Sequence, residues 1–175
     1  LGQIIELNVH SSNKNGKSPL SSKDPMGYGL VFHKILEDSI NAKNLNSMDT
    51  HPLIKTLSTK LQKRLKDSIA KIIANQKLTN LLKNKEVKVE VTLGQDLGTE
   101  GTKIGRIDLM LIDANEVIII DYKSDKHPPK NDKQIPENYQ QQLLIYKSMA
   151  ERIYPSKRIR TMIVWLQTGE LHESN

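Results

Sequence analysis

The sequence predicts an α/β fold in which a mixed central sheet is flanked by helices. Two changes of apolar period support it. Apolar residues recur at helical spacing through the first part of the chain, and from residue 86 they alternate with polar residues, as in half-buried strands. A further helical pattern and a further apolar strand follow. The length of 175 residues suits one domain, since domains typically run to about 50–250 residues.

Two helices are expected before the sheet. Residues 28–40 place their apolar side chains on one broad face. A longer helix is predicted over about residues 53–82, with leucines and isoleucines in one stripe and Lys and Arg opposite. Residues 1–27 are expected to form a linker-like lead-in to a domain at 28–175, because residues 10–27 are rich in Ser, Asn, Lys, Gly and Pro without an apolar period.

Three strands are expected next. In residues 86–93, apolar residues alternate with Glu, Lys and Thr. Residues 104–112 form the second strand, with one face holding Ile107, Leu109 and Leu111. The opposite face of that strand then holds Arg106, Asp108 and Met110. The apolar run within residues 117–123 indicates a strand that is covered on both faces.

One helix and one strand complete the predicted order. Residues 136–153 predict a helix that Pro136 opens, since proline fits the first turn. Residues 159–166 predict a last core strand, with Trp165 as a packing residue, and the next residues turn the chain into a short return. The order is therefore helix, helix, three strands, helix, strand.

The composition excludes several classes of protein. The chain has no Cys, which excludes disulfides, thiolate zinc sites and iron–sulfur clusters. Its longest purely apolar run covers residues 117–120, far below the roughly 20 residues of a membrane helix. No secretory signal is expected either. We therefore expect a cytoplasmic protein without membrane contact.

Positive charge gathers in the first half of the chain. Residues 1–85 carry 14 Lys and Arg against 6 Asp and Glu, whereas residues 86–175 carry 12 against 14. One region could attract a polyanion while the other concentrates carboxylates. A lysine-rich, solvated surface explains the same numbers. Charge alone leaves nucleic-acid binding and a plain surface equally open.

Three residues of the predicted sheet carry candidate chemistry. Asp108 lies in the middle of a strand, where a carboxylate is unfavourable unless it is paired or binds a metal. Asp121 ends the next strand, and Lys123 points to the same side two residues later. Two carboxylates on neighbouring strands can hold a hard divalent cation such as Mg²⁺, which keeps waters and phosphate oxygens as its other ligands.

Two helices contribute further candidates. Gln142 and Tyr146 stand four residues apart on one helical face, as do His33 and Glu37. Each pair has a structural alternative: the first fits an ordinary amphipathic helix, and a helical His often packs or caps. The remaining histidines are expected in exposed loops or ends: His10, His51, His127 and His172.

Together these residues resemble the RecB-like branch of the PD-(D/E)XK nuclease superfamily. The matching motifs occur in the order of that family: GxxxHxxLE at 29–37, a Glu-bearing strand at 86–93, GxxD at 105–108, DYK at 121–123 and QxxxY at 142–146. The resemblance implies a restriction-endonuclease-like core. Residues 121–125, 137–155 and 165–173 are further similar to the carboxy-terminal nuclease domain of AddA, the helicase–nuclease subunit of bacterial AddAB, and the resemblance covers about residues 18–173.

The resemblance implies an Mg²⁺-dependent deoxyribonuclease, of exonuclease type, within an ATP-dependent helicase–nuclease of the bacterial cytoplasm. Such an enzyme acts in double-strand-break repair and recombination. The implied partners are DNA, as the single strand that emerges from the unwound duplex, the helicase portion of the same polypeptide, and an AddB-like subunit. ATP would bind only in a helicase portion outside this chain, and the lack of Cys excludes the iron–sulfur cluster of related nucleases.

The resemblance also assigns roles to residues of this chain. Three side chains and one backbone carbonyl become metal ligands: His33, Asp108, Asp121 and Tyr122. Lys123 becomes the catalytic lysine, while Gln142 and Tyr146 orient the site and touch DNA. The acidic residue of the Glu-bearing strand is Glu90 or Glu86, and register favours Glu90. The imidazole ligand broadens the choice of metal towards Mn²⁺.

Two alternatives to this function stay open. One is a non-catalytic, basic domain that has kept the nuclease fold and docks DNA or a partner. Its weakness is that Asp108, Asp121, Lys123, Gln142 and Tyr146 are all present. The other is a stand-alone nuclease that acts on foreign DNA.

Overall fold

A computed structural model describes residues 4–7, 25–96, 99, 101–125 and 127–174. Within these residues, six strands form one mixed sheet in chain order. Neighbouring strands are antiparallel except β4 and β5, which are parallel. The strands are β1 (Ile4–Leu7), β2 (Glu86–Asp96), β3 (Thr102–Ile112), β4 (Glu116–Lys123), β5 (Arg158–Trp165) and β6 (Glu170–Ser174). The predicted mixed sheet is therefore confirmed.

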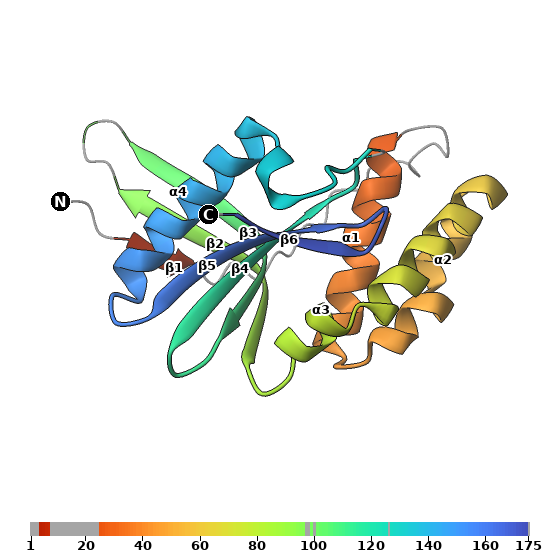
Figure 1. Cartoon of the computed structure of the whole chain (residues 1–175), viewed down its shortest axis with the longest axis horizontal. Coiled ribbons are helices and arrows are strands. Elements are labelled where there is room, and N and C mark those ends of the chain that lie inside the picture. Colours follow the sequence, from red (N-terminus) through yellow and green to blue (C-terminus); the bar gives the residue numbers. More distant parts are fainter. Residues whose placement is uncertain (1–3, 8–24, 97–98, 100, 126, 175) are drawn as a thin grey trace.

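Helices cover both faces of the sheet (Figure 1). One face packs against α1 (Pro25–Asn41), α2 (Thr59–Ala74) and α3 (Gln76–Leu81), together with the 3₁₀ turns η1 (Leu45–Thr50) and η2 (Pro52–Thr56). The other face packs against α4 (Glu137–Ile153), which connects the parallel strands β4 and β5 and follows the short 3₁₀ turn η4 (Asp132–Gln134). Two hydrophobic cores result, one on each side of the sheet.

The predicted long helix over residues 53–82 is wrong. The chain instead forms η2, α2 and α3, and the break between the last two falls at Asn75. The Asn75 side chain accepts a hydrogen bond from the Leu78 N–H (3.0 Å) and donates one to the Gly169 carbonyl (2.6 Å). Asn75 therefore caps α3 and ties it to the β5–β6 turn. The apolar period continues across the break because both helices face the same core.

The predicted faces of β2 and β3 change over in the middle of each strand. Leu109 and Leu111 lie in the core under α1–α3, as expected, but Ile107 lies in the core under α4. The switch coincides with Glu90 on the paired strand, which has a φ of 53° between the pairs Val89–Leu109 and Val91–Ile107. A left-handed residue reverses the direction of the side chains that follow it, so the simple alternation expected from the sequence fails there.

The remaining elements lie close to their predicted positions. α1 begins at Pro25, and Pro136 is the N-cap of α4 rather than part of its first turn. The strand β1 was not expected, because four residues carry too little pattern to indicate a strand. Most of the predicted lead-in, residues 8–24, lies outside the described residues, so its linker character stays a prediction.

Two histidines differ from expectation. His172 lies buried on β6, where its Nδ1 accepts a hydrogen bond from Trp165 Nε1 (3.3 Å). His51 is half-buried and caps η2 while it contacts Asp38 (3.2 Å). His127 is exposed, as predicted, and His10 lies outside the described residues. Among the described helices, none combines the length and the apolar character that a membrane crossing requires.

Candidate active site

A cleft of about 520 Å³ opens between α1, the middle of β2 and β3, the end of β4 and one face of α4. Asp108 and Asp121 lie at its base on neighbouring strands. The β3–β4 register pairs Leu109 with Ile120, so the next position along sets the two aspartates opposite one another. Asp121 is 4% exposed. The strands therefore bring the buried Asp121 and the half-buried Asp108 together, as their sequence positions indicate.

His33 reaches the same cleft from α1. Its Nδ1 lies 3.7 Å from Asp108 Oδ1, and its ring meets the Tyr122 ring edge-on with centroids 5.4 Å apart. Burial lowers the pKa of His33, although the nearby Asp121 and Glu90 charges oppose that shift. A neutral imidazole beside the carboxylates is the form of histidine that can bind a metal.

Negative charge at the base of the cleft is only partly offset. Burial, and then the charge of Asp121, raise the pKa of Asp108 to about 7, although its Oδ2 accepts a hydrogen bond from the Tyr122 N–H (2.7 Å). Asp121 Oδ2 is buried and accepts no hydrogen bond, because Lys123 Nζ approaches to 2.8 Å as an ion pair without hydrogen-bond geometry. One lysine faces two carboxylates, which is an unfavourable balance without a further cation.

Lys123 is held by a chain of side chains from α4. Its Nζ donates a hydrogen bond to Gln142 Oε1 (2.9 Å), and Gln142 Nε2 donates one to the Tyr146 hydroxyl (2.7 Å). The predicted pair Gln142 and Tyr146 therefore contacts the predicted lysine. The ammonium also lies over the Tyr139 ring, 4.3 Å from its centroid, and the Tyr139 hydroxyl donates to the Asp125 carboxylate (3.1 Å).

Tyr139 was not among the residues singled out from the sequence. The signal that could have identified it is its spacing, because Tyr139 precedes Gln142 by three residues and Tyr146 by seven on the same helical face. The aromatic ring and the ion pair with Asp121 hold the Lys123 ammonium in one place. Lys123 is therefore positioned from two sides, by Gln142 and Tyr139 of α4 and by Asp121 of its own strand.

Two glycines of the motifs make room for these contacts. A Cβ at Gly105 would lie 3.0 Å from the Tyr146 ring, and a Cβ at Gly29 would lie 3.0 Å from Ser124 Oγ. Any larger residue at Gly105 would push Tyr146 away from Gln142. The glycines of the GxxD and GxxxH patterns thus have a steric reason in this fold.

The structure brings Glu90, and not Glu86, to the cleft. Glu90 lines it together with Arg106, with which it forms an ion pair. Glu86 lies exposed at the far end of β2, where it pairs in register with Ile112 and contacts Lys88 (3.8 Å). Register thus separates the two candidates as expected, while the left-handed backbone at Glu90 and its Arg106 partner were not foreseen.

The predicted metal ligands share one cleft without forming a ready-made site. Across residues 4–7, 25–96, 99, 101–125 and 127–174, no group of three or more His, Cys, Asp or Glu side chains has metal-binding geometry. The donors nevertheless fit a hard cation, because Asp121 Oδ2 is a buried carboxylate oxygen that accepts no hydrogen bond and lies beside a second carboxylate. Four groups could hold such an ion: Asp108, Asp121, the Tyr122 carbonyl and His33.

The sequence of this chain matches a known protein family. The sequence model of the PD-(D/E)XK nuclease superfamily matches residues 12–173. Among solved structures, the crystal structure of protein VC1899 from Vibrio cholerae is similar with 10% identity and a TM-score of 0.35, over 83% of this chain and 44% of that one. This chain thus spans less than half the length of that protein. No curated protein matches this chain.

Proposed function

The chain belongs to the PD-(D/E)XK nuclease superfamily, and we propose that its domain is a metal-dependent DNA nuclease. The observation that carries the proposal is the meeting of Asp108, Asp121 and Lys123 in one cleft, with Lys123 hydrogen-bonded to Gln142. A lysine and two carboxylates that converge on a recess suit phosphodiester hydrolysis, in which charge develops on the phosphate.

In this proposal, the protein groups divide into those that hold a cation and those that act on the phosphate. Asp108, Asp121, the Tyr122 carbonyl and His33 would hold Mg²⁺ or Mn²⁺, which when bound lowers the pKa of a water ligand and polarises the phosphodiester. Such a cation would relieve the repulsion between the two carboxylates, which together with burial raises the pKa of Asp108 to about 7.

Lys123 is the group that meets the reacting phosphate. Its ammonium can donate to the attacking water or to a phosphate oxygen while Gln142 and Tyr139 hold it. Gln142 bonds the lysine through Oε1 and Tyr146 through Nε2, so hydrogen bonds link the three side chains. The ion pair of Glu90 with Arg106 sets a further carboxylate and an exposed guanidinium at the rim, where phosphate contacts position a strand.

More narrowly, we propose a RecB-like domain of AddA type, within a bacterial cytoplasmic helicase–nuclease that degrades one strand at double-strand breaks. The support is the motif order from Gly29 to Tyr146, the basic first half and the absence of Cys. The substrate would be the single strand that leaves the helicase portion, with an AddB-like subunit as partner and exonuclease action as the expected mode.

The second candidate is a domain that binds DNA or a partner without cutting. It is favoured by one observation: the ligand groups are not in metal-binding geometry among the described residues. It gives no reason for the burial of Asp121, whose Oδ2 accepts no hydrogen bond and has the Lys123 ammonium as an ion-pair partner at 2.8 Å, since buried ion pairs add little stability.

A cleavage assay separates the two candidates. Labelled single-stranded and duplex DNA are incubated with the domain and Mg²⁺ or Mn²⁺, beside an EDTA control. We expect metal-dependent cleavage that Asp121→Asn abolishes and Asp67→Asn leaves unchanged, because Asp67 lies exposed on α2. If the wild-type domain binds DNA but does not cut it with either metal, with the partner subunit present, the docking function is the correct one.

A further inference from the structure

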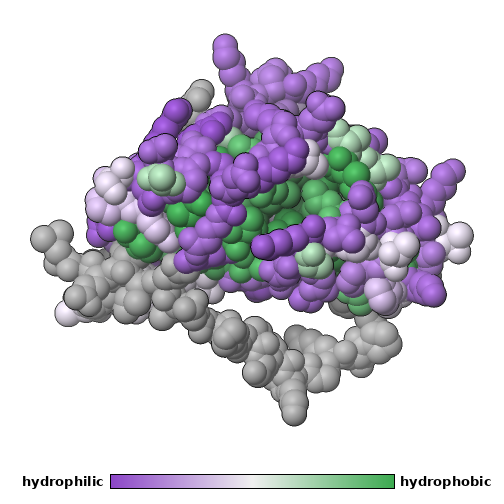
Figure 2. All heavy atoms as spheres, turned by 90° about the horizontal axis from the view of Figure 1, so that it is seen from below, coloured by the Kyte–Doolittle hydropathy of each residue, from purple (hydrophilic) through white to green (hydrophobic). Residues whose placement is uncertain are grey.

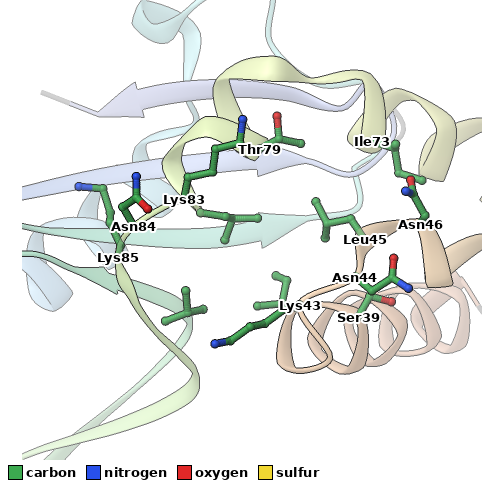
Figure 3. Close-up of a pocket in the computed structure, with 13 residues that line it drawn as sticks. Ser39, Lys43, Asn44, Leu45, Asn46, Ile73, Thr79, Lys83, Asn84 and Lys85 are labelled. Carbon is green, nitrogen blue, oxygen red and sulfur yellow. The ribbon is translucent and has the colours of Figure 1, made fainter.

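A second and larger pocket, of about 710 Å³, lies outside the candidate active site (Figure 3). It is bounded by the end of α1, by η1, by α3 and by the beginning of β2. Figure 2 views the molecule from the lower edge of Figure 1, where α3 leads into β2, and shows apolar surface in a hollow between polar side chains. None of the proposed catalytic groups lines this pocket.

The charged groups around the pocket are all lysines. Lys43 and Lys83 stand on opposite sides of the space, one after α1 and one after α3 (Figure 3). Within the described part of the chain, neither has an acidic partner, and Lys83 Nζ contacts only the neutral Asn80 amide (3.1 Å). The third, Lys85, is neutralised by Asp113 and Glu116. Two ammonium groups are therefore available to one anion.

The rest of the lining is suited to a flat, partly apolar ligand with polar edges. Leu45, Leu82 and Val87 are only half-buried, so the pocket presents apolar surface. Asn44, Asn46 and Asn84 add amide groups, each of which can both donate and accept hydrogen bonds. A nucleotide combines these needs, with an anionic phosphate, a flat base and polar base edges.

The backbone supports a specific role for this pocket. Lys43 and Asn84 have φ values of 53° and 57°, and the other described non-glycine residue with positive φ is Glu90 of the cleft. Lys43 follows the last turn of α1, and its N–H bonds the Ile40 carbonyl (2.9 Å) at a position where glycine is favoured. The Lys43 side chain therefore stands beside the pocket at a backbone position where glycine would be less strained.

We propose that this pocket binds one nucleotide of the DNA strand, with the phosphate between Lys43 and Lys83 and the base against Leu45 and Leu82. The proposal rests on the proposed function, in that the ligand is the nuclease's substrate. From His33 to the end of α1 at Asn41 the helix advances about 12 Å, at ~1.5 Å per residue. That spacing is short enough for one strand of a few nucleotides to reach from the cleft to the pocket.

An acidic peptide is the competing ligand, because glutamate side chains could also meet the two lysines. The amides and the apolar floor would then have little to contact, which is why the nucleotide is favoured. The two ligands are separated by comparing short thymidine oligonucleotides with a glutamate-rich peptide of matched charge.

The first experiment measures binding in EDTA, so that it does not depend on cleavage. Fluorescence anisotropy gives the Kd of single-stranded oligonucleotides of increasing length for the wild type, Lys43→Gly, Lys83→Ala and the control Lys66→Ala, an exposed lysine of α2. We expect each pocket variant to weaken binding of the longer oligonucleotides several-fold and to lower the salt slope by about 1. Lys43→Gly should at the same time raise Tm, since glycine relieves the positive φ.

The proposal fails if Lys43→Gly and Lys83→Ala bind oligonucleotides as tightly as Lys66→Ala does. It also fails if replacing the two lysines weakens binding of the glutamate-rich peptide but not of the oligonucleotides. Photo-crosslinking from an iodinated base should label residues 43–46 and 79–87, and labels confined to the cleft would contradict it. Cleavage in Mg²⁺ tests the nuclease function separately. If the wild-type domain binds DNA through the pocket but does not cut it, the pocket inference stands and the nuclease function fails. If the lysine variants bind and cut DNA as well as the wild type does, the nuclease function stands and the pocket inference fails.

Discussion

The candidate active-site cleft and the lysine-lined pocket differ in charge more than in size. The smaller, about 520 Å³, is lined by four acidic residues, Glu37, Glu90, Asp108 and Asp121, together with the cations Lys34, Arg106 and the half-buried Lys123. The larger, about 710 Å³, has an apolar floor and lysines, with no acidic residue in its lining. The first is suited to hold a cation, and the second to hold an anion. Volume alone favours the lysine-lined pocket, whereas the paired aspartates and the lysine favour the cleft as the proposed nuclease site.

The largest effect is expected from removing either carboxylate of the cleft. Asp108→Ala and Asp121→Ala each delete a proposed ligand, so cleavage should fall by at least about a hundred- to a thousandfold and metal affinity should fall with it. Asp67→Ala on α2 is the matched control. Cleavage rates and calorimetric metal titration are measured on the same preparations. Near-normal metal binding by Asp121→Ala would remove it from the ligand set.

The next effect concerns the contact between the cleft and α4. Gly105→Ala places a methyl group 3.0 Å from the Tyr146 ring, and overpacking of this kind destabilises by about 1–3 kcal/mol. Activity should fall as well, because Tyr146 holds Gln142 on Lys123. Gly101→Ala is the control: its φ of 92° makes alanine strained there, but a Cβ meets nothing within 4 Å. Urea unfolding and cleavage assays should show lost stability in both variants and lost activity only at Gly105.

A smaller effect is expected on the side of the lysine-lined pocket. Asn75→Ala removes the cap of α3 and its bond to the Gly169 carbonyl, at a cost of about 1–2 kcal/mol in unfolding free energy. Since α3 forms one wall of that pocket, oligonucleotide affinity should fall while metal binding in the cleft stays unchanged. Denaturation and anisotropy measure the two effects. Equal losses of metal binding and DNA binding would show that the two hollows are not independent.

The smallest effect lies outside both hollows and serves as a reference. Arg160 bonds both oxygens of Glu173 (2.7 and 2.8 Å) and so lowers the pKa of that carboxyl. Because the folded-state pKa is the lower one, the stabilisation is complete above the unfolded value near 4.5 and disappears as the pH falls through the folded value. Glu173→Gln should remove about 1 kcal/mol or less at neutral pH and flatten the acid limb of the stability profile. An unchanged acid limb in thermal melts would contradict the pairing.

The sequence predicted the parts of the site that follow from short-range periodicity. Asp108, Asp121 and Lys123 could be placed on neighbouring strands because alternation fixes which side a residue faces, and Gln142 and Tyr146 because helical spacing does. The arrival of His33 at Asp108 could not come from periodicity, since α1 and β3 are distant in sequence. It came from the resemblance to a family, and the structure brings the two residues to 3.7 Å.

The parts that were missed depend on single backbone states and on tertiary packing. Nothing in the type of residue 90 signals a φ of 53°, yet the paired strands change faces beside that residue, and Ile107 enters the core under α4. Asn75 ends α2 through a bond to Gly169, a residue nearly a hundred positions away, so local propensity could not indicate the break. The lysine-lined pocket depends on the same break, because α3 forms one of its walls.

The most direct test of the central claim is a paired measurement on Lys123→Ala. Its cleavage rate is compared with that of the wild type and of Lys66→Ala, and metal affinity is titrated by calorimetry on the same samples. We expect the cleavage rate to fall by an amount equivalent to about 3–4 kcal/mol of transition-state stabilisation. Metal should still bind, and more tightly than in the wild type, because the positive charge beside Asp121 is gone. Cleavage at close to the wild-type rate would show that Lys123 is not the catalytic lysine, and the proposed nuclease site would lose its central residue.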